Sequence, residues 1–277
     1  MWKSVKRENL KYLVPVILKA WGDDPCTGKA IICCENVENV GIYFKNLLME
    51  QCSEKQKENI QKIRIPNTIV DRICSMNSED MTIVSEEFHE LSVDKNVLSE
   101  TGIEYINSID NVEGHFYRKR YLLNSYADAI SFLAKKEGLT YLYEAAQNDK
   151  INEQIKPYME LLKDLLHERY HISKEELEQW QEIYRKRLQN DKIPRELTTV
   201  ARNLWEKLTV EERFVKPLIQ LLEMKKDIAE GAKFIKKLIE CGTEDEELSQ
   251  IKEKLMEIWN VCPEGEILFN MIDKISD

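Results

Sequence analysis

From about residue 110 onward, the chain shows only the apolar periodicity of α-helices. Apolar residues recur there at three- and four-residue intervals, as Ile155, Met159 and Leu162 do. This spacing places them on one face of a helix. Ser173 and Glu176 have the spacing of a capping box, which marks a helix start. We therefore predict packed helices over residues 111–136, around 155–170, 173–188, 196–207, 209–224, 227–240, 245–259 and 264–275.

The first part of the chain mixes short extended segments with helices. Residues 30–34 form a continuous apolar run, which is typical of a buried parallel strand. Other extended segments are predicted at 63–73, 82–84, 90–94 and 103–106, helices at 9–21 and 40–51, and a helix or loop at 53–62. The predicted fold class is mainly α with a small α/β part: an α/β domain over residues 1–105 and a helical domain over 106–277.

Composition excludes several classes of function. Apolar residues make up 43% of the chain and charged residues 32%, as in a soluble protein with a buried core. The net charge of −10 argues against nucleic acid or an anionic membrane as the main partner. We expect no transmembrane segment and no signal peptide. Seven cysteines lack CxxC spacing, so we expect reduced thiols in a cytoplasmic protein.

Two polar residues lie on otherwise apolar turns of the predicted helix 111–136. Lys119 could accept a proton from an alcohol if burial lowered its pKa. Asn124 could donate a hydrogen bond to an oxygen that gains negative charge. The alternative is that Lys119 extends to solvent and Asn124 bonds locally.

Other polar residues follow the predicted strands. Asn36 comes directly after the apolar run 30–34, and open parallel sheets bind ligands at the carboxyl ends of their strands. Its alternative role is a turn residue or helix N-cap. Asp71 and Arg72 follow another extended segment, where a surface ion pair is the alternative.

Five short motifs occur in the same order as in the long-chain polyol dehydrogenases. They are Ile31-Ile32-Cys33-Cys34-Glu35-Asn36, Pro66-Asn67-Thr68-Ile69-Val70-Asp71-Arg72-Ile73, Val93-Asp94-Lys95, Lys119 with Asn124 five residues later, and Arg213-Phe214-Val215-Lys216-Pro217. The chain thus resembles this mannitol dehydrogenase family over essentially its whole length, and most of all the mannitol-1-phosphate 5-dehydrogenase branch.

The resemblance implies a fold and a reaction. The fold is the second half of a Rossmann-type dinucleotide-binding domain, residues 1–105, followed by an all-helical substrate domain of the 6-phosphogluconate dehydrogenase type, residues 106–277. The reaction is NAD-linked hydride transfer between a polyol phosphate and a ketose phosphate.

The resemblance also implies roles for individual residues. Lys119 matches the base that takes the hydroxyl proton, and Asn36 and Asn124 match the amide pair that holds the reacting oxygen; Asn36 also falls at the cofactor. The substrate-binding positions are Asp71, Arg72, Lys95, Arg202, Lys207, Arg213 and Lys216. The last four are cations, which suit a phosphate. The alternative is that these four side chains belong to a helix face that only contacts solvent.

Three departures from the family pattern lead us to expect an impaired enzyme. The nine glycines contain no GxG pair, so the turn that holds a dinucleotide pyrophosphate is missing, together with the first half of the domain. Lys6 stands where the family has a small residue. Ala127 stands where the family has a His, three residues after Asn124.

The departures leave two alternatives open besides a truncated relative. The chain could be one half of a split dehydrogenase, with a second polypeptide paired along the open edge of the sheet. It could also be a non-catalytic module that binds a sugar phosphate or forms a homodimer through that edge.

One further motif points to different chemistry. His167-Glu168-Arg169-Tyr170-His171 matches the HExxH pattern of zinc peptidases. Arg169 would place a positive charge beside the metal. Ser173 caps the next helix, so this helix should end near Tyr170 and His171 should not lie one turn along. We therefore expect no metal here.

Overall fold

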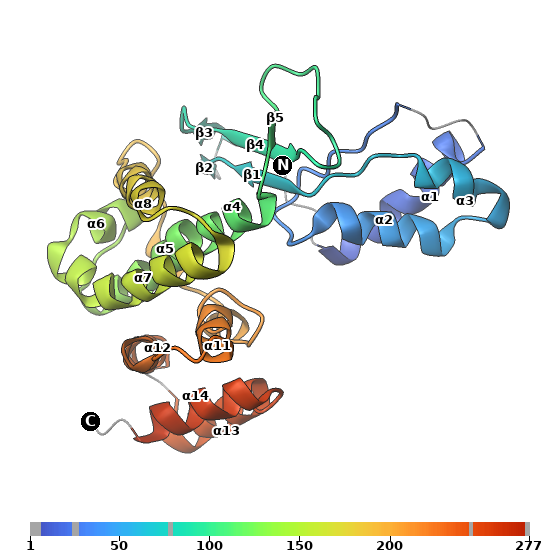
Figure 1. The fold of residues 1–277 in the computed structure, drawn as a ribbon. Helices are drawn as coiled ribbons and strands as arrows, with labels where there is room; N and C mark the ends of the chain where they lie inside the picture. Colours follow the sequence, from blue (N-terminus) through green and yellow to red (C-terminus); the bar gives the residue numbers. More distant parts are fainter. Residues whose placement is uncertain (1–6, 24–27, 77–79, 244–245, 275–277) are drawn as a thin grey trace. The chain divides into compact units, whose positions relative to one another are not determined.

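The structure is a computed structural model that describes residues 7–23, 28–76, 80–243 and 246–274. Two compact units can be separated: unit 1 holds residues up to 74 and 85–116, and unit 2 holds 75–84 and 117 onward. Figure 1 shows the elements in chain order, from blue to red. Within the described residues, no helix combines the length and the apolarity that crossing a bilayer requires.

Four helices form the first part of unit 1. They are η1 (Arg7–Leu13), a 3₁₀-helix, and α1 (Val14–Trp21), α2 (Val40–Gln51) and α3 (Glu54–Gln61). Their apolar faces share one core, which includes Val14, Phe44, Leu48 and Ile60. Lys45 stabilises the end of α3, because its Nζ donates to the carbonyl oxygens of residues 60, 61 and 63 at 2.6, 2.9 and 2.7 Å.

The strands of unit 1 are short. β1 (Thr68–Asp71) pairs antiparallel with β4 (Glu90–Asp94), and β4 pairs parallel with β5 (Asn107–Ile109). In this register Thr68 lies opposite Val93. β2 (Cys74–Met76) and β3 (Ile83–Ser85) form a separate two-stranded sheet, most of whose residues belong to unit 2. The three-stranded sheet is mixed, with one antiparallel and one parallel pair.

The strand predicted at residues 30–34 is wrong. Only a single parallel bridge forms there, between Ala30 and Arg64. Beyond that bridge the described residues pair no further strand with the run, and Cys34 and Asn36 are exposed. A continuous apolar run indicates burial, but a strand also needs a partner for its backbone hydrogen bonds. Residues 103–106 are not a strand either; β5 begins directly after them.

Unit 2 is built around one long helix. α4 (Val112–Lys119) crosses from unit 1 and continues without a break into η2 (Arg120–Ser125) and α5 (Tyr126–Lys136). α5 packs against α6 (Leu142–Gln147), α7 (Asp149–Tyr170), α9 (Leu197–Val200) and α12 (Ala229–Gly242). Its residues 126 to 134 are all buried, so a polar side chain there is surrounded by protein.

The other helices of unit 2 are α8 (Lys174–Leu188), α10 (Leu204–Lys207), α11 (Lys216–Glu223), α13 (Leu248–Trp259) and α14 (Pro263–Lys274). The orange and red helices at the end of the chain are α11 to α14 (Figure 1). The long helix predicted at 111–136 is confirmed, and most of the other helices lie within a few residues of their predicted ranges. α6 was not predicted.

Two predicted helices are wrong in a way that concerns the candidate site. The range 196–207 is split into α9 and α10 by residues 201–203, and Asn203 adopts a left-handed conformation with φ of 54°. Thr209 does not start a helix: Glu212 N donates to Thr209 O at 2.9 Å in a turn, and α11 begins only at Lys216. Arg202 and Arg213 therefore lie on irregular backbone.

Candidate functional site

Lys119 and Asn124 lie at a π-helical turn. η2, which covers Arg120–Ser125, is a π-helix, and Lys119 is its helical N-cap. In a π-helix the hydrogen bonds join residues five apart, so residues i and i+5 lie one above the other. In an α-helix the same step would turn the side chain by about 140° from its starting direction. The π-turn therefore brings Lys119 and Asn124 to one face of the helix.

The Lys119 side chain is only 6% exposed, and Asn124 is partly buried. The alternative in which Lys119 extends to solvent is therefore wrong. Its neighbour Arg118 is fully buried, with its guanidinium 3.7 Å from the centre of the Trp180 ring and its Nε donating to the Tyr184 hydroxyl at 3.2 Å. Arg118 thus fastens this part of the helix to α8 and fixes the backbone that carries Lys119.

Two cations pair with one buried carboxylate in unit 2, and two further cations lie within electrostatic range of the group. Asp128 is 6% exposed, and its Oδ1 and Oδ2 lie 3.0 Å from Lys207 Nζ and 3.0 Å from Arg213 Nη1. Arg195 is near enough for the Asp128 charge to act on it, and Arg202 acts on Lys207 in the same way. We refer to Arg195, Arg202, Lys207 and Arg213 as the cation cluster.

The surroundings of the cation cluster lower the pKa values of two of its members, Lys207 and Arg195. Burial lowers the pKa of Lys207, the charge of Asp128 opposes this change, and Arg213 and Arg202 add to it. Burial also lowers the pKa of Arg195, again opposed by Asp128. In both groups burial is the main cause of the lowered pKa, and the charge of Asp128 offsets it in part.

The loop that carries Arg213 is fastened to the π-turn. Arg120 donates from Nη2 to Glu211 O at 2.9 Å and pairs with Glu212 at 3.1 Å. The Ser125 hydroxyl lies 3.1 Å from both Arg120 O and Arg213 O. The π-turn thus sets the position of Lys119, Asn124 and Arg213 together, although Arg213 is far away in the sequence.

Of the four predicted phosphate-binding cations, Arg202, Lys207 and Arg213 belong to the cation cluster and Lys216 has different neighbours. Lys216 pairs with Glu211 at 3.2 Å and lies 5.4 Å from the centre of the Tyr117 ring. Arg195 and Asp128 were missed by the sequence analysis. Each is a single charged residue on a predicted helix or loop, which is also the pattern of an ordinary surface position.

The remaining predicted site residues belong to unit 1. Asn36 is exposed, and Asp71 is 3% exposed at the end of β1. Arg72 donates from Nε and Nη2 to Glu86 O at 3.1 and 2.9 Å. Lys95 forms an exposed ion pair with Asp110 at 3.0 Å, a contact of little energetic weight. The pairing of Asn36 with Asn124 stays a prediction, because the two residues belong to different units.

Asn67, a member of the most specific motif, has a structural role. Its Oδ1 accepts hydrogen bonds from Gly41 N at 3.0 Å and Ile42 N at 3.3 Å, which are backbone donors in the first turn of α2. These donors have no partner within the helix. The motif therefore ties β1 to the start of α2, a contact that sequence reasoning missed.

The HExxH segment does not have metal-binding geometry. α7 ends at Tyr170, as predicted, and His171 is in the left-handed conformation with φ of 58°. His167 Nδ1 lies 2.8 Å from Ile172 O. Among the residues with described positions, His, Cys, Asp and Glu form no group of three or more that could hold a metal ion.

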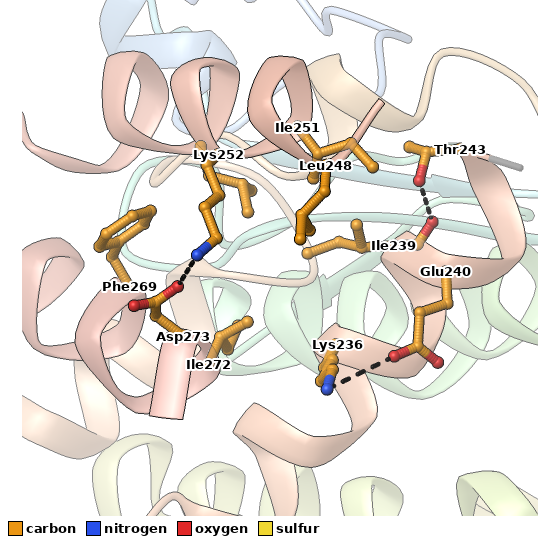
Figure 2. A pocket seen from close by; sticks show the side chains of 11 residues that line it. Lys236, Ile239, Glu240, Thr243, Leu248, Ile251, Lys252, Phe269, Ile272 and Asp273 are labelled. Carbon is orange, nitrogen blue, oxygen red and sulfur yellow. Dashed lines mark hydrogen bonds and ion pairs between the residues drawn. The ribbon is translucent and has the colours of Figure 1, made fainter. Parts of the chain in front are cut away.

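A pocket of about 390 Å³ lies between α12, α13 and α14 (Figure 2). Its wall is largely apolar, with Ile239, Leu248 and Phe269 among its residues. Lys252 pairs with Asp273 at 2.5 Å across it, and Lys236 pairs with Glu240 at 3.8 Å. With its charges paired to one another, this pocket has the chemistry of an apolar groove and not of a proton-transfer site.

Known proteins resemble this chain in sequence and in fold. A mannitol-1-phosphate 5-dehydrogenase from Caldanaerobacter subterraneus is 29% identical over 198 residues, which are 68% of this chain and 50% of that protein. One from Pyrenophora tritici-repentis is 26% identical over 201 residues, 70% of this chain and 52% of that protein. The chain thus spans about half the length of the curated relatives it matches.

Two solved structures have a similar fold. The Pseudomonas fluorescens mannitol 2-dehydrogenase, in a ternary complex with NAD and D-mannitol, superposes with a TM-score of 0.72 and 14% identity, covering 97% of this chain and 62% of that one. A substrate-free D-sorbitol dehydrogenase superposes with a TM-score of 0.66 and 15% identity, covering 96% and 63%. At these identities the likeness concerns the fold alone.

Family models match both parts of the chain. The mannitol dehydrogenase Rossmann domain matches residues 7–106, and the mannitol dehydrogenase C-terminal domain matches residues 111–257. The helical match alone covers more than half of the chain. The chain therefore belongs to the mannitol dehydrogenase family.

Proposed function

We propose that this chain binds a polyol phosphate, or the matching ketose phosphate, in unit 2. The phosphate would lie at the cation cluster and the reacting hydroxyl at Lys119. The observation that supports this most is that the π-turn carries a buried lysine and an amide and contacts the loop of Arg213, which Asp128 joins to Lys207. The curated relatives are named for mannitol 1-phosphate, and we propose that compound as the substrate.

The cation cluster suits a phosphate dianion. Lys207 and Arg213 pair with Asp128, and Arg195 and Arg202 lie within electrostatic range of members of this group, so the cluster holds more cations than carboxylates. The nearby pair of Arg120 and Glu212 adds no net charge. Arginine offers paired N–H donors and lysine a compact charge, which together bind phosphate oxygens. An unphosphorylated polyol would lack this interaction.

We assign the chemistry of the hydroxyl group to Lys119 and Asn124. Oxidation of the alcohol carbon to a carbonyl removes a hydride from that carbon and a proton from its oxygen. Neutral Lys119 would take the proton through Nζ. Asn124 would donate N–H groups to the oxygen as its charge grows; the second-amide role of Asn36 stays a prediction from the resemblance.

The cofactor that we propose for the family reaction is NAD, because the mannitol 2-dehydrogenase of similar fold forms a ternary complex with NAD. A Rossmann-type domain holds the pyrophosphate at a glycine-rich turn before a helix. The described residues do not fit that role: Gly41, in the first turn of α2, packs against the backbone of Ile65 and Pro66, where a Cβ would come within 2.4 Å. We therefore derive no step that passes through the cofactor.

Isothermal titration calorimetry with mannitol 1-phosphate and with mannitol tests this function. We expect the phosphorylated compound to bind with a Kd below about 1 mM and mannitol to give no heat at that concentration. Arg213→Gln should weaken binding roughly tenfold to a hundredfold, because a charged hydrogen bond to the phosphate is lost. Arg169→Gln, at an exposed pair with Glu223, is the matched control. Equal binding of the two polyols would refute the proposal.

A second candidate is a sugar-phosphate-binding protein without turnover. Ala127 favours it, since this buried position has no imidazole to assist the proton transfer. Adding NAD to the calorimetry sample and following absorbance at 340 nm separates the two. Binding with a rate about 10² to 10⁴ below that of an intact relative would support impairment. A normal rate would exclude this candidate.

A further inference from the structure

Asp128 stands out among the charged residues of the proposed site. It is the only carboxylate whose described ion pairs join Lys207 and Arg213, and one oxygen pairs with each, at 3.0 Å. It follows Ala127 in α5 and lies four residues after Asn124, so it is on the same face of the helix as Asn124. The carboxylate therefore lies inside the group of residues that we assign to the substrate, not at its edge.

Both partners of Asp128 retain donors. Lys207 Nζ has three donors, and its described acceptors are Asp128 and Val200 O, the latter at 2.8 Å. Arg213 has five, of which Nη1 faces Asp128 and Nε faces Glu212 at 3.5 Å. An arriving anion could therefore bind both cations without displacing Asp128. It would, however, lie close to a second negative charge.

We propose that Asp128 is an internal counter-ion that sets how tightly the cation cluster holds a phosphate group. It balances part of the positive charge while the site is empty, and it repels the phosphate of a bound ligand. The consequence is a site that releases inorganic phosphate readily and needs the polyol part of the ligand for retention. This inference rests on the proposed function, because it takes the cation cluster as the phosphate site.

A purely structural role for Asp128 predicts the opposite result. If the carboxylate only held Lys207 and Arg213 in place, its removal would loosen them and weaken every anion that they bind. If it acts as a counter-ion, its removal takes a negative charge away from a dianion at close range. Inside a protein such a repulsion is large enough to change affinity by a factor of ten or more. The sign of the change therefore separates the two roles.

The test is calorimetry with inorganic phosphate and, separately, with mannitol 1-phosphate, on the unaltered chain and on Asp128→Asn. We expect Asp128→Asn to bind inorganic phosphate at least about tenfold more tightly. Asp164→Asn is the matched control, since it removes one carboxylate from an exposed pair with Lys174. Unchanged or weaker phosphate binding by Asp128→Asn would overturn the counter-ion role.

A second pair of variants covers the case in which Asp128→Asn does not fold because its cations repel one another. Lys207→Gln and the double variant Asp128→Asn/Lys207→Gln differ only in the carboxylate. The double variant should bind inorganic phosphate at least about tenfold more tightly than Lys207→Gln; equal affinity would again overturn the role. Failure of the proposed function is a separate result, namely that the unaltered chain does not prefer mannitol 1-phosphate to mannitol.

Discussion

Lys119 and Lys207 are both largely buried, yet they have different neighbours and different proposed roles. Lys119 projects from the π-turn beside the buried Arg118. Lys207 ends the short helix α10 and faces Asp128 and the carbonyl of Val200. The first is proposed to exchange a proton with the substrate and the second to hold a charge. Without the resemblance to the family, the sequence marks both only as lysines in a helical region.

The lowered pKa of Lys207 predicts a pH dependence of stability. Its pKa in the folded chain lies below the ordinary value of 10.5, so the folded state binds this proton less readily than the unfolded state. The stability that Lys207 contributes should therefore rise as pH increases from the folded pKa towards 10.5 and fall again as pH is lowered. Urea unfolding gives the free energy of unfolding of the unaltered chain and of Lys207→Gln at pH 7 and at pH 10. At each pH, the difference between the two chains is the contribution of Lys207.

The difference between the two chains cancels the titration of the other lysines, which both share. A stability difference that stays constant between pH 7 and pH 10 would show that Lys207 has the same proton affinity in both states. If Lys207→Gln became more stable relative to the unaltered chain as pH rises, the sign would be opposite to the one we expect.

At the residue scale, the sequence analysis named Lys119, Lys207 and Arg213 through the resemblance to the family, and their roles stay predictions. Asp128 was not named, and its partner Arg213 is 85 residues away in the sequence. A charged residue whose partner is that distant has no local signal, because the contact exists only in the folded chain.

At the scale of single elements, the π-turn is the feature that organises the site. It was not predictable, since the apolar spacing of residues 111–136 suits a plain α-helix. Lys119 and Asn124 are five residues apart, so an α-helix would direct their side chains to different sides, whereas the π-turn places them on one face. The elements that were predicted with correct bounds, α2 and β4, have apolar patterns that agree with their local surroundings.

Ser125 provides a test of the link between the π-turn and the Arg213 loop. Ser125→Ala removes the hydroxyl that lies 3.1 Å from both Arg120 O and Arg213 O. We expect a loss of about 1 kcal/mol in the free energy of unfolding and weaker binding of mannitol 1-phosphate, because the loop that carries Arg213 is released. Urea unfolding and calorimetry measure the two effects.

Ser131→Ala is the matched control for this change. Ser131 is fully buried in the same long helix, and its hydroxyl donates to Ala127 O at 2.7 Å, a bond within α5. It should lower stability by a similar amount and leave the affinity unchanged. If both variants weakened binding equally, the effect would reflect general loss of stability and not the position of the loop.

At the scale of the whole molecule, the sequence motifs were sufficient to identify the family. The order of five motifs pointed to the polyol dehydrogenases, and both family domains match. The arrangement of strands in unit 1 was less predictable. The run 30–34 has the composition of a central strand, but among described residues its backbone meets Arg64 in one bridge only. Composition indicates burial, whereas sheet order depends on which segments are available to pair.

The chain spans about half the length of its curated relatives, so the proposals concern mainly what unit 2 does. Unit 2 contains Lys119, Asn124 and the whole cation cluster. The contacts that we propose for the phosphate and for the reacting hydroxyl at Lys119 involve residues of unit 2. A polyol phosphate should therefore bind to the chain without NAD.

A crystal structure of the chain with mannitol 1-phosphate tests the central claim most directly. We predict the phosphate within hydrogen-bond distance of Lys207 and Arg213, and a carbon-bound hydroxyl about 3 Å from Lys119 Nζ. A ligand whose phosphate lies elsewhere, for example at Lys216, or whose hydroxyl groups do not reach Lys119, would contradict the account.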